Sequence, residues 1–234
     1  MTARTPIDSS PFQDLLIVDI GGTVASGYAG KLYADYGARV VNLEPSEGFS
    51  TRHIAPLLDN GTSAIHAYLH ANKQSVSCTD SVLTHPAILA ADLVILDVST
   101  LPTSLAVDDF DTNVCAISWY GLTGPYAGFR GSDASIHALT GLMHGIGHTD
   151  GPPIIPTGYQ AQVIGGLSAF NGSVGFLLGH VLSGPERSGA FCLDASIWEA
   201  NMCLTDIGAA MSFNNQPMPK RLGINRFAPT YPLG

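Results

Sequence analysis

The chain has 234 residues, of which 45% are hydrophobic and only 12% are charged. This length indicates one domain or two small ones, and this apolar content excludes an intrinsically disordered protein. The formal net charge of −9 repels phosphate backbones, so we expect no nucleic-acid partner.

Targeting and redox features favour a cytoplasmic protein. Residues 1–14 lack the apolar stretch of a signal peptide, and no run of about 18 apolar residues marks a membrane span. The four cysteines show no CxxC spacing, which favours reduced thiols over a disulfide framework or a zinc site. We therefore expect a cytoplasmic protein that spans no membrane and holds no metal.

The chain opens with a strand, a turn, a helix and a second strand. Residues 15–19 form a short apolar run that ends in Asp19 and leads into a double glycine. Residues 28–36 have helical spacing, and residues 40–43 predict the second strand. This order is that of a βαβ unit, in which the two strands are parallel.

The alternation of strands and helices continues along the chain. Further strands are predicted from residue 76 onward and at residues 93–98, 114–118 and 190–193. Further helices are predicted at residues 63–71, 86–91, 133–149, 163–182 and 196–212. Such alternation indicates an α/β fold, with a parallel sheet covered by helices on both faces. Ligands of these sheets bind beyond the carboxyl ends of the strands.

Two short motifs suggest chemistry that their context does not support. Residues 19–23 (DIGGT) resemble the phosphate loop of sugar kinases, but that loop lies in a β-hairpin, whereas helical spacing follows here. A strand-to-helix turn remains, either as plain structure or as a place where a phosphorylated ligand approaches a helix N-terminus. His66 and His70 have the spacing of a helical metal pair, yet no HExxH motif accompanies them. We expect both histidines on a partly exposed helix face.

Basic residues are few, so each one beside a glycine-rich loop is a candidate contact for an anionic ligand. The chain has 10 lysines and arginines, among them Arg52 after a loop with Gly48 and Arg130 after a turn with Gly124. For both arginines the alternative is an ordinary solvated side chain. The Gly-x-Ser-x-Gly motif of α/β-hydrolases is absent.

The order of several short segments resembles family III CoA-transferases, the group that includes formyl-CoA transferase and α-methylacyl-CoA racemase. The similar segments are residues 17–45, 72–76 (NKQSV), 91–94, 117–126 (ISWYGLTGPY), 131–133, 141–143 and 150–153. Each segment alone is unspecific, and it is their shared order that identifies the chain as a member of this family.

The resemblance implies a Rossmann-like large domain and an interlocked homodimer, in proteins considerably longer than this chain. We therefore expect residues 1–213 to be the N-terminal part of the large CoA-binding domain, and residues 214–234 to be a linker toward an absent small domain. In that case the chain is a portion of a longer protein, or one subunit that pairs with a second family III chain.

The family reaction, as the resemblance implies it, moves CoA from an acyl-CoA to a carboxylic acid. An aspartate attacks the thioester, which is covalent catalysis by a carboxylate. This aspartate lies four residues before a glycine at the start of a small-residue helix, and counting back from Gly166 places Gln162 there. The candidate CoA contacts implied by the resemblance are Val24, Ala25, Arg52, Lys73 and Arg130.

Other positions also depart from the family pattern. Gln74 stands where the family has an arginine, and Ser132 stands where the racemase branch has a histidine. Three hypotheses therefore remain open: an acyl-CoA:carboxylate CoA-transferase or its N-terminal part, a catalytically degenerate CoA-binding or structural subunit, and a racemase-like enzyme. We favour the first for the class, whereas Gln162 favours the second for the mechanism.

Overall fold

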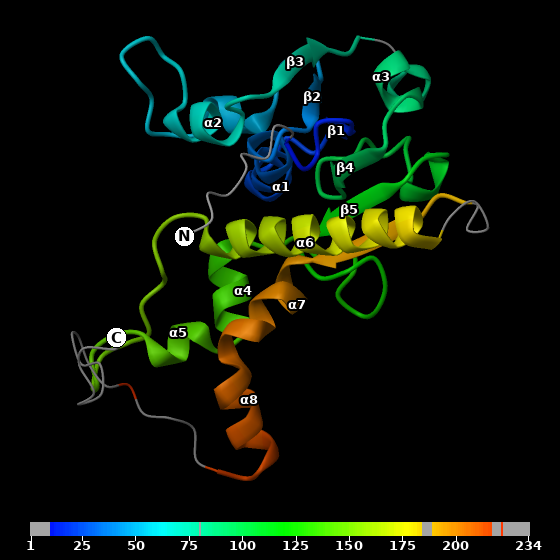
Figure 1. Cartoon of the computed structure of the whole chain (residues 1–234). Coiled ribbons are helices and arrows are strands. Elements are labelled where there is room, and N and C mark those ends of the chain that lie inside the picture. The colour runs from blue at the N-terminus through cyan, green and yellow to red at the C-terminus, as the bar shows by residue number, and fades with distance from the viewer. Residues whose placement is uncertain (1–9, 80, 184–188, 217–220, 222–234) are drawn as a thin grey trace, which may run out of the picture.

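A six-stranded parallel sheet forms the centre of the protein in this computed structural model, which describes residues 10–79, 81–183, 189–216 and 221 (Figure 1). The strands are β1 (Leu16–Asp19), β2 (Arg39–Glu44), β3 (Gln74–Ser77), β4 (Leu93–Asp97), β5 (Val114–Ser118) and β6 (Cys192–Ser196). Their order is β3-β2-β1-β4-β5-β6, and every neighbouring pair is parallel. This is the strand order of the Rossmann fold, so the expected fold class is confirmed.

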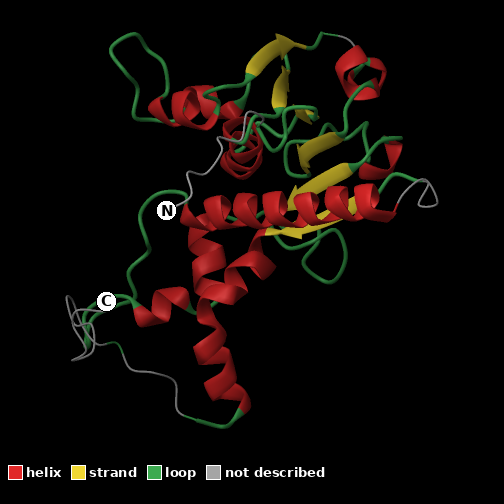
Figure 2. Ribbon diagram, in the orientation of Figure 1, coloured by secondary structure: helices red, strands yellow, loops and turns green. Residues whose placement is uncertain are grey.

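Helices connect the strands and cover the sheet (Figure 2). The α-helices are α1 (Val24–Asp35), α2 (Ala64–Leu69), α3 (Pro86–Leu89), α4 (Asp133–Leu139), α5 (Leu142–Gly145), α6 (Gln160–Ser183), α7 (Ile197–Met202) and α8 (Asp206–Phe213). Short 3-10 helices are η1 (Ser50–His53), η2 (Val82–Thr84), η3 (Val107–Asp109) and η5 (Cys203–Thr205). Of the expected linker, residues 217–220 and 222–234 lie outside the described part of the chain, so the division at residue 213 stays a prediction.

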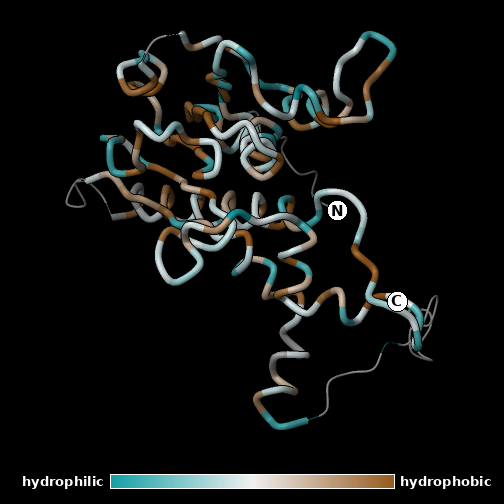
Figure 3. Tube along the Cα trace, turned by 180° about the vertical axis from the view of Figure 1, so that it is seen from behind, coloured by the Kyte–Doolittle hydropathy of each residue, from teal (hydrophilic) through white to brown (hydrophobic). Residues whose placement is uncertain are grey.

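The two faces of the sheet pack against different layers, because side chains alternate along each strand. Leu93 and Ile95 of β4 join the apolar cluster that includes residues of α1 and α6. Val94 and Leu96 of the same strand join a second cluster with Ile88 of α3. Both faces of the central strands are therefore apolar. The colours of the trace show hydrophobic residues along these strands, whereas the turn after α8 is hydrophilic (Figure 3).

Helix α6 is the longest element and packs through its glycines. A Cβ atom on Gly165 would lie 2.7 Å from a side-chain carbon of Ile197, and one on Gly172 would lie 2.9 Å from Leu193. Residues Gln160–Gly179 are also long and apolar enough to cross a membrane by length and composition alone. The expected absence of a membrane span therefore stays a prediction.

Several boundaries differ from those that the sequence suggested. The segment expected as one helix over residues 133–149 forms two short helices, because Gly141 adopts a left-handed conformation with φ of 80° between them. The last helix is likewise interrupted by η5. Helix α1 begins earlier than expected, since Thr23 caps it in a capping box with Ser26.

Candidate functional site

The carboxyl ends of β1 and β4 lie side by side where the strand order reverses, which is the position of ligand sites in open α/β sheets. The turn after β1 occupies this place. Asp19 accepts a hydrogen bond from Gly21 N at 3.0 Å, and Asp97 at the end of β4 accepts one from Thr23 Oγ1 at 2.9 Å. Because β1 pairs in parallel with β2, the β-hairpin of a sugar-kinase phosphate loop is excluded.

Glycine is required in this turn for steric reasons. A Cβ atom on Gly21 would lie 2.6 Å from the Ser26 side chain and 3.0 Å from Asp97 N. Gly22 has a φ of 63°, in the left-handed region that side chains rarely adopt. The turn thus delivers the backbone directly into α1, with Val24 as its first helical residue.

Position 162 lies at the start of α6, where the side chain of Gln162 is bound to Asp133 at the start of α4. Gln162 Nε2 donates to Asp133 Oδ2 at 2.9 Å. Asp133 Oδ1 accepts from the backbone N–H groups of Ala161 at 2.9 Å and of Gln162 at 3.3 Å. The Asp133 carboxylate therefore caps α6 and holds the Gln162 carboxamide at the same time.

Helix α6 crosses α1 one turn after Gln162. A Cβ atom on Gly166 would lie 2.4 Å from Ala25 O and 3.2 Å from Tyr28 Cβ, so the two helices approach as closely as glycine allows. This crossing places the amino end of α6 over the amino end of α1. Position 162 and residues Val24 and Ala25, which the sequence proposed for one site, are thus brought to the same region, with Val24 and Ala25 in the first turn of α1.

Lys73, a predicted CoA contact, lies inside the protein. Its ammonium group is 3.4 Å from Asp19 Oδ2 in an ion pair whose two side chains are fully buried. It also donates to the Gly27 carbonyl at 2.9 Å. Burial lowers the pKa of Lys73, while the adjacent Asp19 carboxylate opposes that shift. The positive charge of Lys73 is thus neutralised by the Asp19 carboxylate inside the protein.

Arg52, a second predicted contact, is paired with Glu44 at the end of β2. Arg52 Nε and Nη2 donate to the two carboxylate oxygens at 2.7 and 2.6 Å, and Phe49 N donates to the same group at 2.9 Å. Burial raises the pKa of Glu44, but the hydrogen bonds from Arg52, Ser75 and Phe49 outweigh it and lower this pKa to about 2. Arg130 is exposed in the loop between β5 and α4, and the structure does not place it with this pair.

A buried polar cluster joins α2 to these ion pairs. Thr51 Oγ1 lies 2.9 Å from His66 Nδ1 and 3.2 Å from His70 Nε2. His70 Nδ1 faces Asn42 Nδ2 at 2.9 Å and Lys73 Nζ at 3.4 Å, so this ring nitrogen accepts and the ring is neutral. Burial and the charge of Lys73 accordingly lower the pKa of His70 to about 2.

The partly exposed position expected for these histidines is wrong for His66, which is only 7% exposed, whereas His70 is half-buried. Both rings point inward because Thr51 of η1 supplies a hydroxyl partner, which the spacing within α2 could not reveal. No group of three His, Cys, Asp or Glu side chains suited to a metal ion occurs among the described residues.

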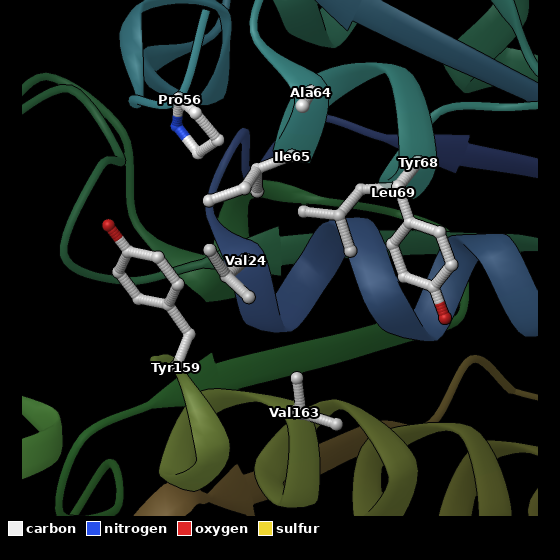
Figure 4. A pocket seen from close by; sticks show the side chains of 8 residues that line it. All are labelled: Val24, Pro56, Ala64, Ile65, Tyr68, Leu69, Tyr159 and Val163. Carbon is white, nitrogen blue, oxygen red and sulfur yellow. The ribbon is translucent and has the colours of Figure 1, made fainter. Parts of the chain in front are cut away.

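An apolar pocket of about 300 Å³ lies at the amino end of α6, where Val163, the residue after Gln162, contributes to its lining (Figure 4). It is lined by Val24 of α1, by Pro56, by Ala64, Ile65, Tyr68 and Leu69 of α2, and by Tyr159 and Val163 at the start of α6. The aliphatic side chains point toward one another, and the two tyrosine rings stand at opposite ends with their hydroxyl groups directed outward (Figure 4). Neither this pocket nor the role of Asp133 followed from the sequence, since α2 and α6 meet only in the folded chain.

A Rossmann-type sheet with a small-residue helix crossing its first helix defines the class of protein. Residues 12–79 and 114–232 match the model of CoA-transferase family III, and the chain belongs to this family. It is 28% identical over 214 residues to mouse succinyl-CoA:glutarate CoA-transferase, covering 85% of this chain and 48% of that protein. It is 27% identical over 233 residues to a succinate–glutarate CoA-transferase of Agrobacterium fabrum, covering 89% of this chain and 54% of that protein.

The fold agrees with that of solved proteins. A CAIB/BAIF family protein from Brucella suis superposes with a TM-score of 0.78 at 24% identity, over 92% of this chain and 60% of that one. The chain thus spans about half the length of the curated relatives it matches.

Proposed function

We propose that the chain is the N-terminal part of an acyl-CoA:carboxylate CoA-transferase that acts in the cytoplasm on CoA thioesters and carboxylic acids. The supporting observation is the position of Gln162, where the family resemblance places the nucleophile. It lies at the amino end of α6, over the amino end of α1 and beside a pocket. CoA is a substrate in this proposal. The rest of the protein, a second copy in an interlocked homodimer, or a separate family III chain would complete the site.

The family reaction requires a carboxylate that attacks the thioester carbonyl carbon. The C–S bond breaks, CoA leaves as a thiolate, and the acyl group forms a mixed anhydride with the enzyme. The thiolate then attacks the enzyme carbonyl, which gives an enzyme thioester and releases the acyl carboxylate. An acceptor carboxylate reverses these steps and leaves with CoA. The carboxamide of Gln162 lacks the negative oxygen that starts this sequence.

A second candidate is a CoA-binding subunit without catalysis of its own. The observation in its favour is that Asp133, the acid beside position 162, accepts three hydrogen bonds from Ala161 and Gln162. Such donors stabilise a carboxylate and weaken it as a nucleophile. A racemase-like activity has less support, because Ser132 is the helix cap of α4 where that branch has a histidine.

Exchange of labelled CoA between an acyl-CoA and a carboxylate tests the proposal, with hydroxylamine used to detect an acylated enzyme. If the unchanged chain exchanges CoA and Gln162→Ala abolishes this exchange, the result supports a transferase in which Gln162 takes part. Absence of exchange, together with retained CoA binding, supports the subunit without catalysis.

Restoring the carboxylate requires attention to Asp133. Gln162→Asp alone would place two carboxylates where 2.9 Å now separates Gln162 Nε2 from Asp133 Oδ2, and one of them would have to hold a proton. The double variant Gln162→Asp with Asp133→Asn exchanges the positions of carboxylate and amide and keeps one charge. We expect exchange from the double variant at neutral pH, and Asp133→Asn alone is its matched control. Absence of exchange from the double variant, placed in the protein that completes the site, contradicts position 162 as the site of the nucleophile.

A further inference from the structure

The pocket beside position 162 has a chemistry that the names of the relatives would not suggest. Its lining is aliphatic or aromatic throughout, from α1, α2, the start of α6 and the loop before α2. Val24 and Leu69 are only 4% and 2% exposed, so its floor is firmly packed. We propose that this pocket binds an uncharged aliphatic acyl group, and this proposal rests on the proposed function.

The position of the pocket assigns it to the acyl group. Val163 follows Gln162 directly in α6, and Tyr159 lies just before this helix, so the pocket adjoins the backbone of position 162 while the Gln162 side chain itself is held by Asp133. Val24 is the first residue of α1 and one of the positions where the resemblance places a CoA contact. A thioester that passes the amino end of α1 therefore has its acyl chain next to this lining.

The charges near the pocket argue against a second carboxylate on the acyl group. Lys31 lies over the ring of Tyr68 at 5.0 Å, but it already pairs with Asp35 at 2.9 Å. Arg52 is held by both oxygens of Glu44. A carboxylate transferred into such a lining would lose its hydration without gaining a partner.

The volume sets the size of the ligand. At about 300 Å³ the pocket is at the small end of the range for small-molecule sites, which fits a short acyl chain. Each methylene added within that space should tighten binding about fourfold, because it leaves water for a carbon-lined environment. The gain should stop once the pocket is full.

A binding series on the chain tests the proposal with free CoA, butyryl-CoA and succinyl-CoA, measured by titration calorimetry. The two acyl groups have the same number of carbons and differ in a terminal methyl or carboxylate. We expect butyryl-CoA to bind at least about tenfold more tightly than succinyl-CoA. Equal or tighter binding of succinyl-CoA overturns the acyl assignment and leaves the proposed function standing. Failure of all three ligands overturns both.

A pair of variants on α2 identifies the pocket as the cause. Ile65→Arg adds a cation to the lining, and we expect it to reduce the preference for butyryl-CoA at least about tenfold. Ala67→Arg adds the same charge to an exposed position of the same helix and should leave the preference unchanged. If neither acyl-CoA binds more tightly than free CoA, the pocket does not receive the acyl group and the proposal is overturned.

Discussion

The two faces of the short helix α2 differ sharply in chemistry. One face carries His66 and His70, which join Thr51 and the Lys73–Asp19 ion pair in a buried polar cluster. The opposite face carries Ile65 and the neighbouring apolar residues that line the pocket. Both faces lie close to the carboxyl edge of the sheet, where a ligand is expected.

The comparison shows that a basic side chain near the expected ligand site is not necessarily free to bind an anionic ligand. Two of the three basic residues predicted to contact an anionic ligand are paired inside the chain, Lys73 with Asp19 and Arg52 with Glu44. The pocket lies instead on the apolar face of α2, whose lining residues carry no charge. We infer that the polar face fixes the position of α2, and that the apolar face is the one presented to a ligand.

Removing the cation from the polar face should have the largest effect. Lys73→Met leaves the fully buried Asp19 carboxylate without its partner, and we expect a loss of about 3–5 kcal/mol in the free energy of unfolding. Chemical denaturation measures this loss.

The control and the rescue make the result specific. Lys31→Met removes the i,i+4 pair with the exposed Asp35 and the contact of Lys31 with the Tyr68 ring, and should cost about 1 kcal/mol. Adding Asp19→Asn to Lys73→Met removes the unpaired charge and should recover most of the stability. A loss for Lys73→Met as small as that for Lys31→Met would show that the buried pair does not hold the polar face together.

The sheet and its connections were predictable because their signals are local. The apolar runs and the glycine turn after β1 fix a parallel α/β arrangement without any knowledge of partners. Positions of single side chains were harder to predict. Gln162 could be placed at the start of α6 only through Gly166, and its partner Asp133 lies on another helix, so no spacing in the sequence joins the two.

The burial of Lys73 illustrates what the sequence could not supply. Its ammonium group faces Asp19 because β3 pairs with β2, and β2 with β1, and this register exists only in the folded sheet. A carboxylate at the end of a buried strand was the available signal, since such a group needs a partner. The single helix predicted over residues 133–149 was wrong for a related reason, because Gly141 adopts a left-handed conformation that divides an otherwise helical pattern into two helices.

Acid should weaken the polar face before it affects the rest of the site. His70 has its pKa lowered from 6.5 to about 2, so the unfolded chain binds a proton near pH 6.5 and the folded chain does not. Stability therefore falls as the pH drops below 6.5, by at most about 1.4 kcal/mol per pH unit from this group. Glu44, lowered from 4.5 to about 2, adds a further loss that begins only below pH 4.5.

The two windows separate the histidines of the polar cluster, whose pKa values are both lowered, from Glu44, and a variant of His70 then separates it from His66. The free energy of unfolding of His70→Gln, followed by urea denaturation between pH 7 and pH 4.5, should depend less steeply on pH than that of the unchanged chain. Glu44→Gln should alter the slope only below pH 4.5. Equal slopes for His70→Gln and the unchanged chain above pH 4.5 would show that His70 is accessible to protons in the folded state.

The smallest effect concerns the helix crossing that brings position 162 to the pocket. Gly166→Ala places a Cβ atom 2.4 Å from Ala25 O, so α6 must move away from α1, at a cost of about 1–3 kcal/mol in thermal unfolding. Gly175→Ala is the matched control, since its Cβ would meet nothing within 4 Å and should stabilise the same helix by about 0.5–1 kcal/mol. Because Val24 and Val163 line the pocket from the two helices, Gly166→Ala should also weaken acyl-CoA binding, whereas Gly175→Ala should not. Unchanged binding in a destabilised Gly166→Ala chain would separate the crossing from the pocket, and would leave α2 as the element that shapes it.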